Sequence, residues 1–207
     1  LASLGNGMQE ASLLLAVVCV PVFVNYYGFR VFEMGKGALL LALALPALLG
    51  GAVALAEGGA EGVARLFAAL RRPLAALTLI GLASVAISTA VSTAQTYSLY
   101  GSPERVFGLV TWLALAVFFA AAANVGRAPE RRRRIVAAIV AGSVPVSVYA
   151  LTQAAGMEAV PGIAENSRAF GTLANPIFLG AYLMLVAPLT LERLVAAARG
   201  ARAGVFA

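Results

Sequence analysis

The chain has 207 residues, of which 61% are hydrophobic and 12% charged, with a mean hydropathy of +0.91 and a net charge of +6. Soluble domains are roughly half apolar and a quarter charged, so this composition excludes an ordinary soluble domain and indicates an integral membrane protein. In such a protein the positive charge is mainly a signal of topology, and we expect no nucleic acid as partner.

Several residue types are absent or rare, and their absence limits the possible chemistry. The sequence has no histidine and no aspartate, and it has a single lysine, Lys36, and a single cysteine, Cys19. A zinc site, a histidine-based catalytic triad and haem ligation by histidine are therefore excluded within this chain. We expect it to bind no metal and no cofactor through its side chains.

Apolar runs long enough to cross a bilayer, which takes roughly 20 residues, recur along the whole chain. We therefore predict an all-α, polytopic transmembrane helix bundle with about six spans, forming a single domain over residues 1–207. The spans are expected at about 11–27, 37–56, 73–95, 107–125, 135–155 and 175–198.

The segments around the first two spans carry distinct signals. Residues 1–10 are expected to form a short polar lead. The second span is interrupted by Pro46 and by Gly50-Gly51, as the fifth is by Pro145, because proline removes a helical hydrogen bond. Residues 57–72 hold three arginines and two glutamates, and we expect them to form an interfacial helix.

The third span carries serines at a helical spacing. Ser84, Ser88 and Ser92 recur every four residues, so they share one helix face. We favour a packing surface for another helix, since small residues let membrane helices approach closely. The alternative is a polar face that lines a cavity for lipid headgroups.

The basic residues predict the orientation of the bundle. If the N-terminus is cytoplasmic, the inner segments 57–72, 127–134 and 193–207 hold eleven Lys and Arg residues, and the outer loops hold four. Cytoplasmic loops are enriched in Lys and Arg, so this asymmetry predicts that both termini are cytoplasmic.

The stretch before the sixth span predicts an anion site. Proline suits the first turn of a helix, and Asn175 before Pro176 can cap that helix through its side-chain oxygen. A helix N-terminus attracts anions, and Arg168 lies shortly upstream, with Gly171 allowing the backbone to approach a ligand. This pattern predicts a phosphate-binding corner at the membrane surface. The simpler alternative is a loop arginine beside a capped helix, paired with Glu165.

A second arginine is predicted to lie on the same outer face. Arg105 sits in the turn-rich loop YSLYGSPERVFG between the third and fourth spans. Guanidinium groups pair bidentately with phosphate, so Arg105 and Arg168 together suit a diphosphate.

Three stretches carry a resemblance to a known family. VPVFVNYYGFRVFEMGKGALL, YSLYGSPERVFG and NSRAFGTLANPIFLGAYL resemble the N-terminal half of the O-antigen ligase/polymerase-like membrane glycosyltransferases, especially the branch that often carries C-terminal tetratricopeptide repeats. The resemblance covers most of the chain in order and spacing. It implies metal-independent glycosyl transfer from a polyprenyl-diphosphate-linked glycan, on the outer face of the bacterial cytoplasmic (inner) membrane.

The same resemblance assigns roles to individual residues. Arg168 matches the arginine expected to face the donor diphosphate, and Arg105 matches the arginine of the upstream loop. Asn175 and Pro176 match the first two positions of the family's N-P-N, whereas Ile177 replaces the second asparagine. The predicted substrate-binding residues are thus Arg168, Arg105, Asn175 and Gly171.

Two other functions stay open at this point. The family's catalytic residues lie in a later half, so we expect this chain to be the N-terminal half of a longer protein and name no catalytic residue. The alternatives are a non-catalytic transmembrane subunit of a larger complex, or a transporter with proline-broken helices. The sequence has no charged residue clearly buried in mid-span, which counts against the transporter.

Overall fold

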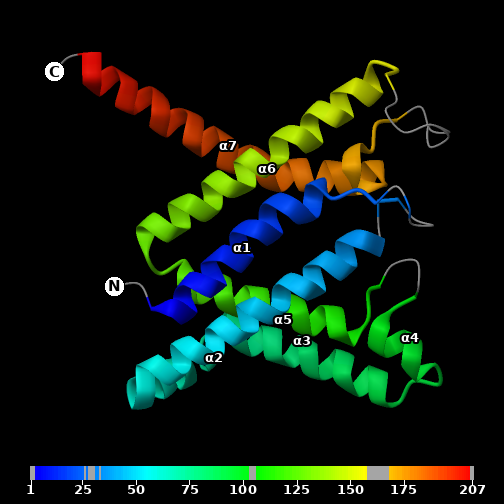
Figure 1. Ribbon diagram of the computed structural model, residues 1–207, viewed down its shortest axis with the longest axis vertical. Helices are drawn as coiled ribbons and strands as arrows, with labels where there is room; N and C mark the ends of the chain where they lie inside the picture. The colour runs from blue at the N-terminus through cyan, green and yellow to red at the C-terminus, as the bar shows by residue number, and fades with distance from the viewer. Residues whose placement is uncertain are drawn as a thin grey trace.

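The protein is an all-α helix bundle, as predicted. The computed structural model describes residues 3–25, 27, 31–32, 34–102, 106–157 and 168–205. In these ranges it forms seven α-helices and one 3₁₀ turn, η1, with no strand. The elements are α1 (Leu4–Val22), α2 (Met34–Leu70), α3 (Pro73–Ala90), α4 (Gln95–Tyr100), α5 (Leu109–Val125), α6 (Pro129–Ala154), η1 (Gly171–Leu173) and α7 (Pro176–Val205), as Figure 1 shows.

Five of the described helices, α1, α2, α3, α6 and α7, are long and apolar enough to cross a membrane. The helix α5 is also apolar but shorter, with 17 residues. Each predicted span overlaps one of these six helices. The chain is therefore a multi-pass membrane protein by its helices, while the number of spans and their orientation stay predictions.

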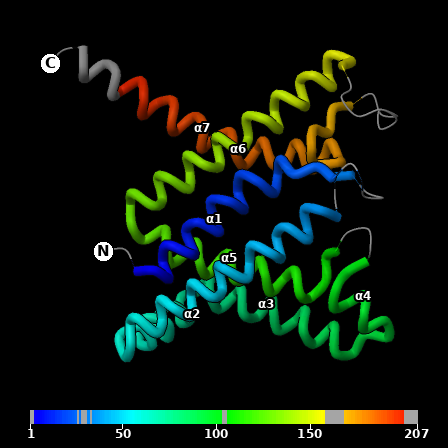
Figure 2. The backbone as a smooth tube through the Cα atoms, in the orientation of Figure 1, coloured from blue at the N-terminus to red at the C-terminus, as the bar shows by residue number. Residues whose placement is uncertain are grey.

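The long helices run back and forth between two ends of the bundle (Figures 1 and 2). At the terminal end lie both chain termini, the α2–α3 turn and the α5–α6 turn. At the opposite, loop end lie the connections from α1 to α2, from α4 to α5 and from α6 to α7. The basic segments 57–72 and 127–134 share the terminal end, in agreement with the predicted placement of both termini on one side.

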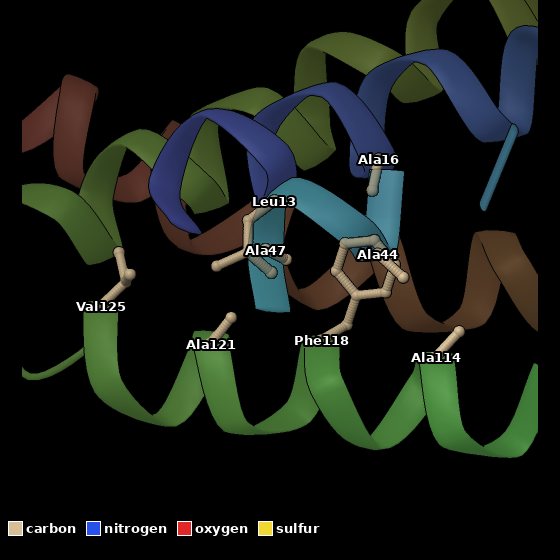
Figure 3. Close-up of a cluster of buried hydrophobic side chains, with 8 residues drawn as sticks. All are labelled: Leu13, Ala16, Ala44, Ala47, Ala114, Phe118, Ala121 and Val125. Atoms are coloured by element: carbon tan, nitrogen blue, oxygen red, sulfur yellow. The ribbon is translucent and has the colours of Figure 1, made fainter. Parts of the chain in front are cut away.

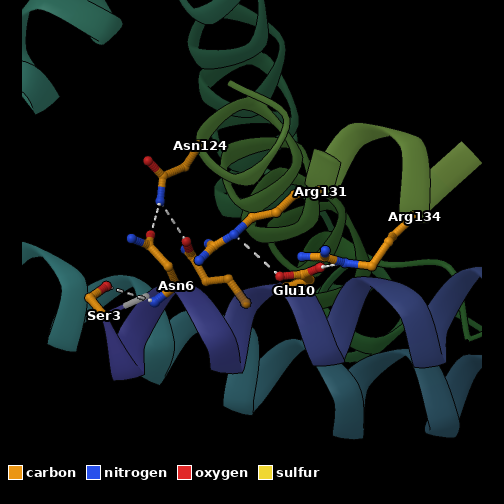
Figure 4. A network of polar contacts seen from close by, with 7 residues as sticks. Ser3, Asn6, Glu10, Asn124, Arg131 and Arg134 are labelled. Atoms are coloured by element: carbon orange, nitrogen blue, oxygen red, sulfur yellow. Dashed lines mark hydrogen bonds and ion pairs between the residues drawn. The ribbon is translucent and has the colours of Figure 1, made fainter. Parts of the chain in front are cut away.

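The predicted polar lead is wrong, because the first helix already begins at Leu4. The hydroxyl of Ser3 caps α1 by accepting from the N–H of Asn6 at 3.2 Å. Polar side chains of the first turns find partners on α5: the amide nitrogen of Asn124 donates to Asn6 Oδ1 and to Gln9 Oε1, each at 2.8 Å. Figure 4 shows this network, which makes the polar segment part of the bundle.

A buried carboxylate connects α1 with α6. Glu10 is nine-tenths buried, and its two oxygens contact Arg134 Nε at 2.6 Å and Arg131 Nε at 3.3 Å (Figure 4). These arginines are helical because α6 begins at Pro129, before the predicted span start at 135, and proline is favoured at the first helical position. The basic block therefore lies on the first turns of a helix, where it neutralises Glu10.

The main apolar core lies where α1, α2 and α5 meet. Phe118 of α5 is its largest side chain, and small residues surround it (Figure 3). The buried members of this core are Leu13, Ala16, Ala44, Ala47, Ala114, Phe118, Ala121 and Val125. Alanines dominate the contact, so the three helices pack closely.

The closest helix contact is between the backbones of α1 and α2. A Cβ atom added at Gly5 would lie 2.8 Å from the Cα of Ala54, and one added at Gly50 would lie 2.7 Å from the carbonyl oxygen of Gly5. Only glycine leaves room for such an approach. The Gly50-Gly51 pair therefore serves helix packing and does not interrupt α2.

The break in α2 occurs later than predicted. The helix continues through Pro46, as α6 does through Pro145, which membrane helices tolerate because other groups satisfy the freed carbonyls. The backbone leaves helical geometry at Gly59, with φ 51° and ψ −138°. A Cβ atom added at Gly62 would lie 2.8 Å from the carbonyl oxygen of Leu55, so the chain folds back sharply here. The segment after the kink corresponds to the predicted interfacial helix.

Two of the three serines predicted to form a packing face, Ser84 and Ser88, contact no other described helix, whereas Ser92 lies beyond the end of α3 and accepts from the hydroxyl of Ser98 at 2.7 Å. Ser84 and Ser88 are exposed, and only Thr89 of α3 is buried. The seven other helices and turns thus leave most of α3 free, so a packing role for these serines requires a partner beyond the described residues.

The predicted orientation can be tested by cysteine labelling. In a Cys19→Ala background, single cysteines placed at 101–103 and 160–166 should react with an impermeant maleimide from outside, while cysteines at 128–133 should not. Cells labelled before and after permeabilisation give both measurements. The reverse pattern would place the loop end in the cytoplasm.

The backbone contact between α1 and α2 predicts a contrast between two glycines. Gly5→Ala should lower the unfolding free energy by about 1–3 kcal/mol, because the added methyl group forces the helices apart. Gly7 lies two residues further along α1 and has open space around it, so Gly7→Ala should be neutral or slightly stabilising. Thermal unfolding of both variants in the same detergent checks this. Equal effects would show that the close approach does not limit stability.

Candidate functional site

The start of α7 forms as predicted. The helix begins at Pro176, and the side-chain oxygen of Asn175 accepts from the N–H of Ile177 at 2.8 Å. The predicted cap is therefore confirmed. The same bond occupies one of the N–H groups expected to serve an anion, so the helix terminus offers fewer free donors than the sequence suggested.

The turn that precedes α7 is fixed to α6 by a buried amide. The side-chain oxygen of Gln153 accepts from the N–H of Gly171 at 2.7 Å and from the N–H of Phe170 at 3.1 Å. Gln153 itself is nine-tenths buried. Two adjacent backbone groups, two and three residues after Arg168, are thereby held in place.

Gly171 allows close packing of the turn, while its predicted role at a ligand stays a prediction. Its φ of 58° lies in the left-handed region that favours glycine. It is buried, and a Cβ atom there would lie 3.2 Å from Leu179 and 3.4 Å from the carbonyl oxygen of Val146. The close approach that this glycine permits is to α6 and α7, and its N–H is already bound, so any contribution to a ligand site is through the shape of the turn.

A second anchor joins the turn to the end of α1. The hydroxyl of Thr172 donates to the carbonyl oxygen of Pro21 at 2.6 Å. The ammonium of Lys36 donates to the same oxygen at 2.5 Å and to the carbonyl oxygen of Val20 at 3.2 Å. Carbonyls in the last turn of a helix lack helical partners and attract cations, which explains both contacts.

Sequence reasoning missed Gln153 and Lys36 as parts of this region. Lys36 is the only lysine in the sequence, and that rarity was the one signal available. Its ammonium and the Thr172 hydroxyl share the carbonyl oxygen of Pro21 as acceptor. Nothing local distinguishes Gln153 from other interfacial glutamines, because its partners lie on another segment.

An aromatic contact and a strained residue complete the turn. Phe170 is buried against Phe32, with ring centroids 5.6 Å apart at an interplanar angle of 71°, an edge-to-face geometry. Ala174 adopts a left-handed conformation with φ 63° immediately before the cap residue Asn175. The turn is thus held by α1, α6 and the connection that contains Phe32.

Arg168 lies at the start of this fixed turn, and its side chain is exposed. No ion pair joins it to another described residue, and its predicted alternative partner, Glu165, lies outside the described residues. Arg105 also lies outside them, so a joint clamp by the two arginines stays a prediction. The two ends of the loop that contains Arg105 lie close together, because Gly101 and Gly108 are in contact.

The chemistry that this arrangement supports is binding of an anion. An exposed guanidinium at the edge of an anchored turn can donate two parallel hydrogen bonds to a phosphate without ordering a mobile segment first. The nearby cap of α7 adds partial positive charge.

The anchor from α6 generates a stability prediction. Gln153→Leu should lower the unfolding free energy by about 1–3 kcal/mol, because two N–H groups in the buried turn lose their acceptor. Thr152→Val is the matched control, since the Thr152 hydroxyl bonds only a carbonyl of its own helix. It should stay within about 0.5 kcal/mol of the parent. Thermal unfolding compares the two, and similar losses would argue against the anchor.

Comparisons with known proteins add no family assignment to this geometry. No family model, no curated protein and no solved structure matches the chain. What the site does must therefore be inferred from its residues and from the sequence resemblance.

Proposed function

We propose that the protein binds a polyprenyl-diphosphate-linked glycan at its loop end, as a membrane glycan ligase/polymerase-like protein of the bacterial inner membrane. The observation that carries the proposal is Arg168, exposed at the edge of a turn that Gln153, Thr172 and Asn175 fix to three helices. The sequence resemblance supports the choice of a diphosphate lipid as ligand.

The position of Arg168 suits a ligand that is half lipid. The turn lies at one end of helices long enough to cross a membrane, where headgroups of bilayer lipids are found. A prenyl chain can lie along the exposed apolar helix surfaces while its diphosphate reaches the guanidinium. Binding at this level leaves the glycan in water.

The other predicted residues have supporting parts in this proposal. Asn175 sets the start of α7, and Gly171 sets the shape of the turn, so both act by placing Arg168. Arg105 is proposed as a second phosphate ligand from the neighbouring loop. Lys36 adds positive charge at the end of α1, where its ammonium is bound to the carbonyl oxygens of Val20 and Pro21.

A second candidate function is that of a non-catalytic transmembrane subunit. The exposed serine face of α3 favours it, because small residues suit contact with another membrane helix. In that case the purified chain should recruit a partner through α3 and should show no preference for diphosphate lipids. The two candidate functions thus differ in the expected ligand, which is a diphosphate lipid at the turn before α7 in the first and a membrane protein at α3 in the second.

Substitution of Arg168 tests the proposed function. Charge-assisted hydrogen bonds contribute about 1.5–3 kcal/mol each, so Arg168→Ala should weaken binding of undecaprenyl diphosphate at least about tenfold. Arg168→Lys should restore only part of the affinity, because an ammonium cannot form the bidentate pair. Arg71→Ala, which removes an exposed arginine at the terminal end, should bind normally.

Binding and thermal stability are to be measured on the same purified variants. If Arg168→Ala lowers stability but leaves the affinity for undecaprenyl diphosphate unchanged, the arginine is structural and the proposed site is wrong. An equal loss of affinity in Arg71→Ala would indicate general attraction by the basic surface.

A further inference from the structure

A shallow, widely open cleft of about 400 Å³ lies at the terminal end, where α5 turns into α6. Its walls are mostly apolar, and two arginines belong to its lining, Arg127 from the turn and Arg132 from the first turns of α6. The complete lining is Ala122, Ala123, Gly126, Arg127, Arg132, Ile135 and Val136. Because the cleft is open, a ligand there would stay partly exposed to its surroundings.

The arginines at this corner fall into two pairs with different surroundings. Arg131 and Arg134 contact the buried carboxylate of Glu10 and are neutralised there. Arg127 and Arg132 are exposed, and no described acidic side chain forms an ion pair with either. The cleft therefore combines an apolar wall with two cations that no described acidic side chain neutralises.

The surrounding backbone adds to this positive charge. The helix α6 has 26 residues and begins without a side-chain cap, since its N-cap residue is Ala128. Its first turn therefore contributes partial positive charge close to Arg127 and Arg132. Glu130 lies in the same turn and offsets part of it, yet the corner keeps more arginines than glutamates.

We propose that this cleft binds an anionic phospholipid, with the phosphate between Arg127 and Arg132 and part of one acyl chain against the alanines and Ile135. Basic pockets between helices, at the level of the headgroups, are suited to anionic lipids. An apolar wall alone would not distinguish anionic from neutral lipids. Two cations alone would bind any anion. The combination selects a ligand with both parts.

The site is independent of the proposed glycan-lipid site. It lies at the terminal end, and Arg168 lies at the loop end, at the opposite side of the bundle. A ligand here would be a bilayer lipid of the leaflet that faces the terminal end. Failure of either proposal leaves the other unaffected.

Titration of the purified chain with dioleoyl phosphatidylglycerol in a neutral detergent tests the proposal, with bound lipid counted by native mass spectrometry. The double variant Arg127→Ala/Arg132→Ala should bind phosphatidylglycerol at least about tenfold more weakly, since each surface cation contributes about 1 kcal/mol. Arg133→Ala is the matched control: its arginine is the next residue in the same helix and is also exposed, but it does not line the cleft. It should bind like the parent.

A third variant keeps every charge and fills the cleft. Ala123 is exposed and lines the apolar wall, so Ala123→Phe should fold normally and weaken phosphatidylglycerol binding by blocking the acyl chain. If the double arginine variant does not fold, Ala123→Phe decides alone.

Three results would overturn the proposal. An equal loss in Arg133→Ala would show that the whole basic surface attracts the lipid. Equal affinity of the parent for dioleoyl phosphatidylcholine would remove the role of charge. Stabilisation of the parent by inorganic phosphate to the same extent as by phosphatidylglycerol would assign the arginines to a free anion.

Discussion

The buried carboxylate of Glu10 is the constraint on which the position of α1 depends. A charged group in the interior of a helix bundle is costly unless it is paired, and here two arginines of α6 supply the pairing. Asn124 of α5 donates to two further polar side chains of the same helix, Gln9 next to Glu10 and Asn6 one turn before it. These contacts fix α1 between α5 and α6, and α2 then packs along its length. The rest of the bundle is arranged around this helix.

Glycine and alanine residues allow the helices that the polar contacts bring together to pack closely. Lipid tails are as apolar as leucine, so helices in a membrane gain little from burying apolar surface against each other and associate through close packing. The backbones of α1 and α2 touch at Gly5 and Gly50, and alanines line the core around Phe118. The polar network sets which helices meet at the terminal end, and the small residues set how closely they approach further along.

Local signals in the sequence predicted the helices, and long-range partners decided where the prediction failed. Apolar runs located the five long helices and the shorter α5, and the cap formed by Asn175 is a local bond that the sequence alone indicates. The early start of α1 was missed because its polar residues are stable only beside α5 and α6. The packing face was assigned to serines of α3, whereas glycines at Gly5 and Gly50 make the close contact. Gln153 and Lys36 were missed because their partners lie on other segments of the chain. Gln153 accepts from the turn before α7, and Lys36 donates to the end of α1.

The left-handed conformation of Ala174 has a consequence for how the turn before α7 comes into being. An alanine at φ 63° is unfavourable by about 1 kcal/mol or more, so an isolated peptide of this sequence would choose another geometry. In the folded protein the turn depends on two acceptors from other helices, the carbonyl oxygen of Pro21 in α1 and the side-chain oxygen of Gln153 in α6. Its formation is therefore cooperative with assembly of the bundle. The Arg168 guanidinium at the edge of the turn is therefore positioned only when the bundle is assembled. A substitution that weakens the buried contacts of the turn would also weaken binding at the surface.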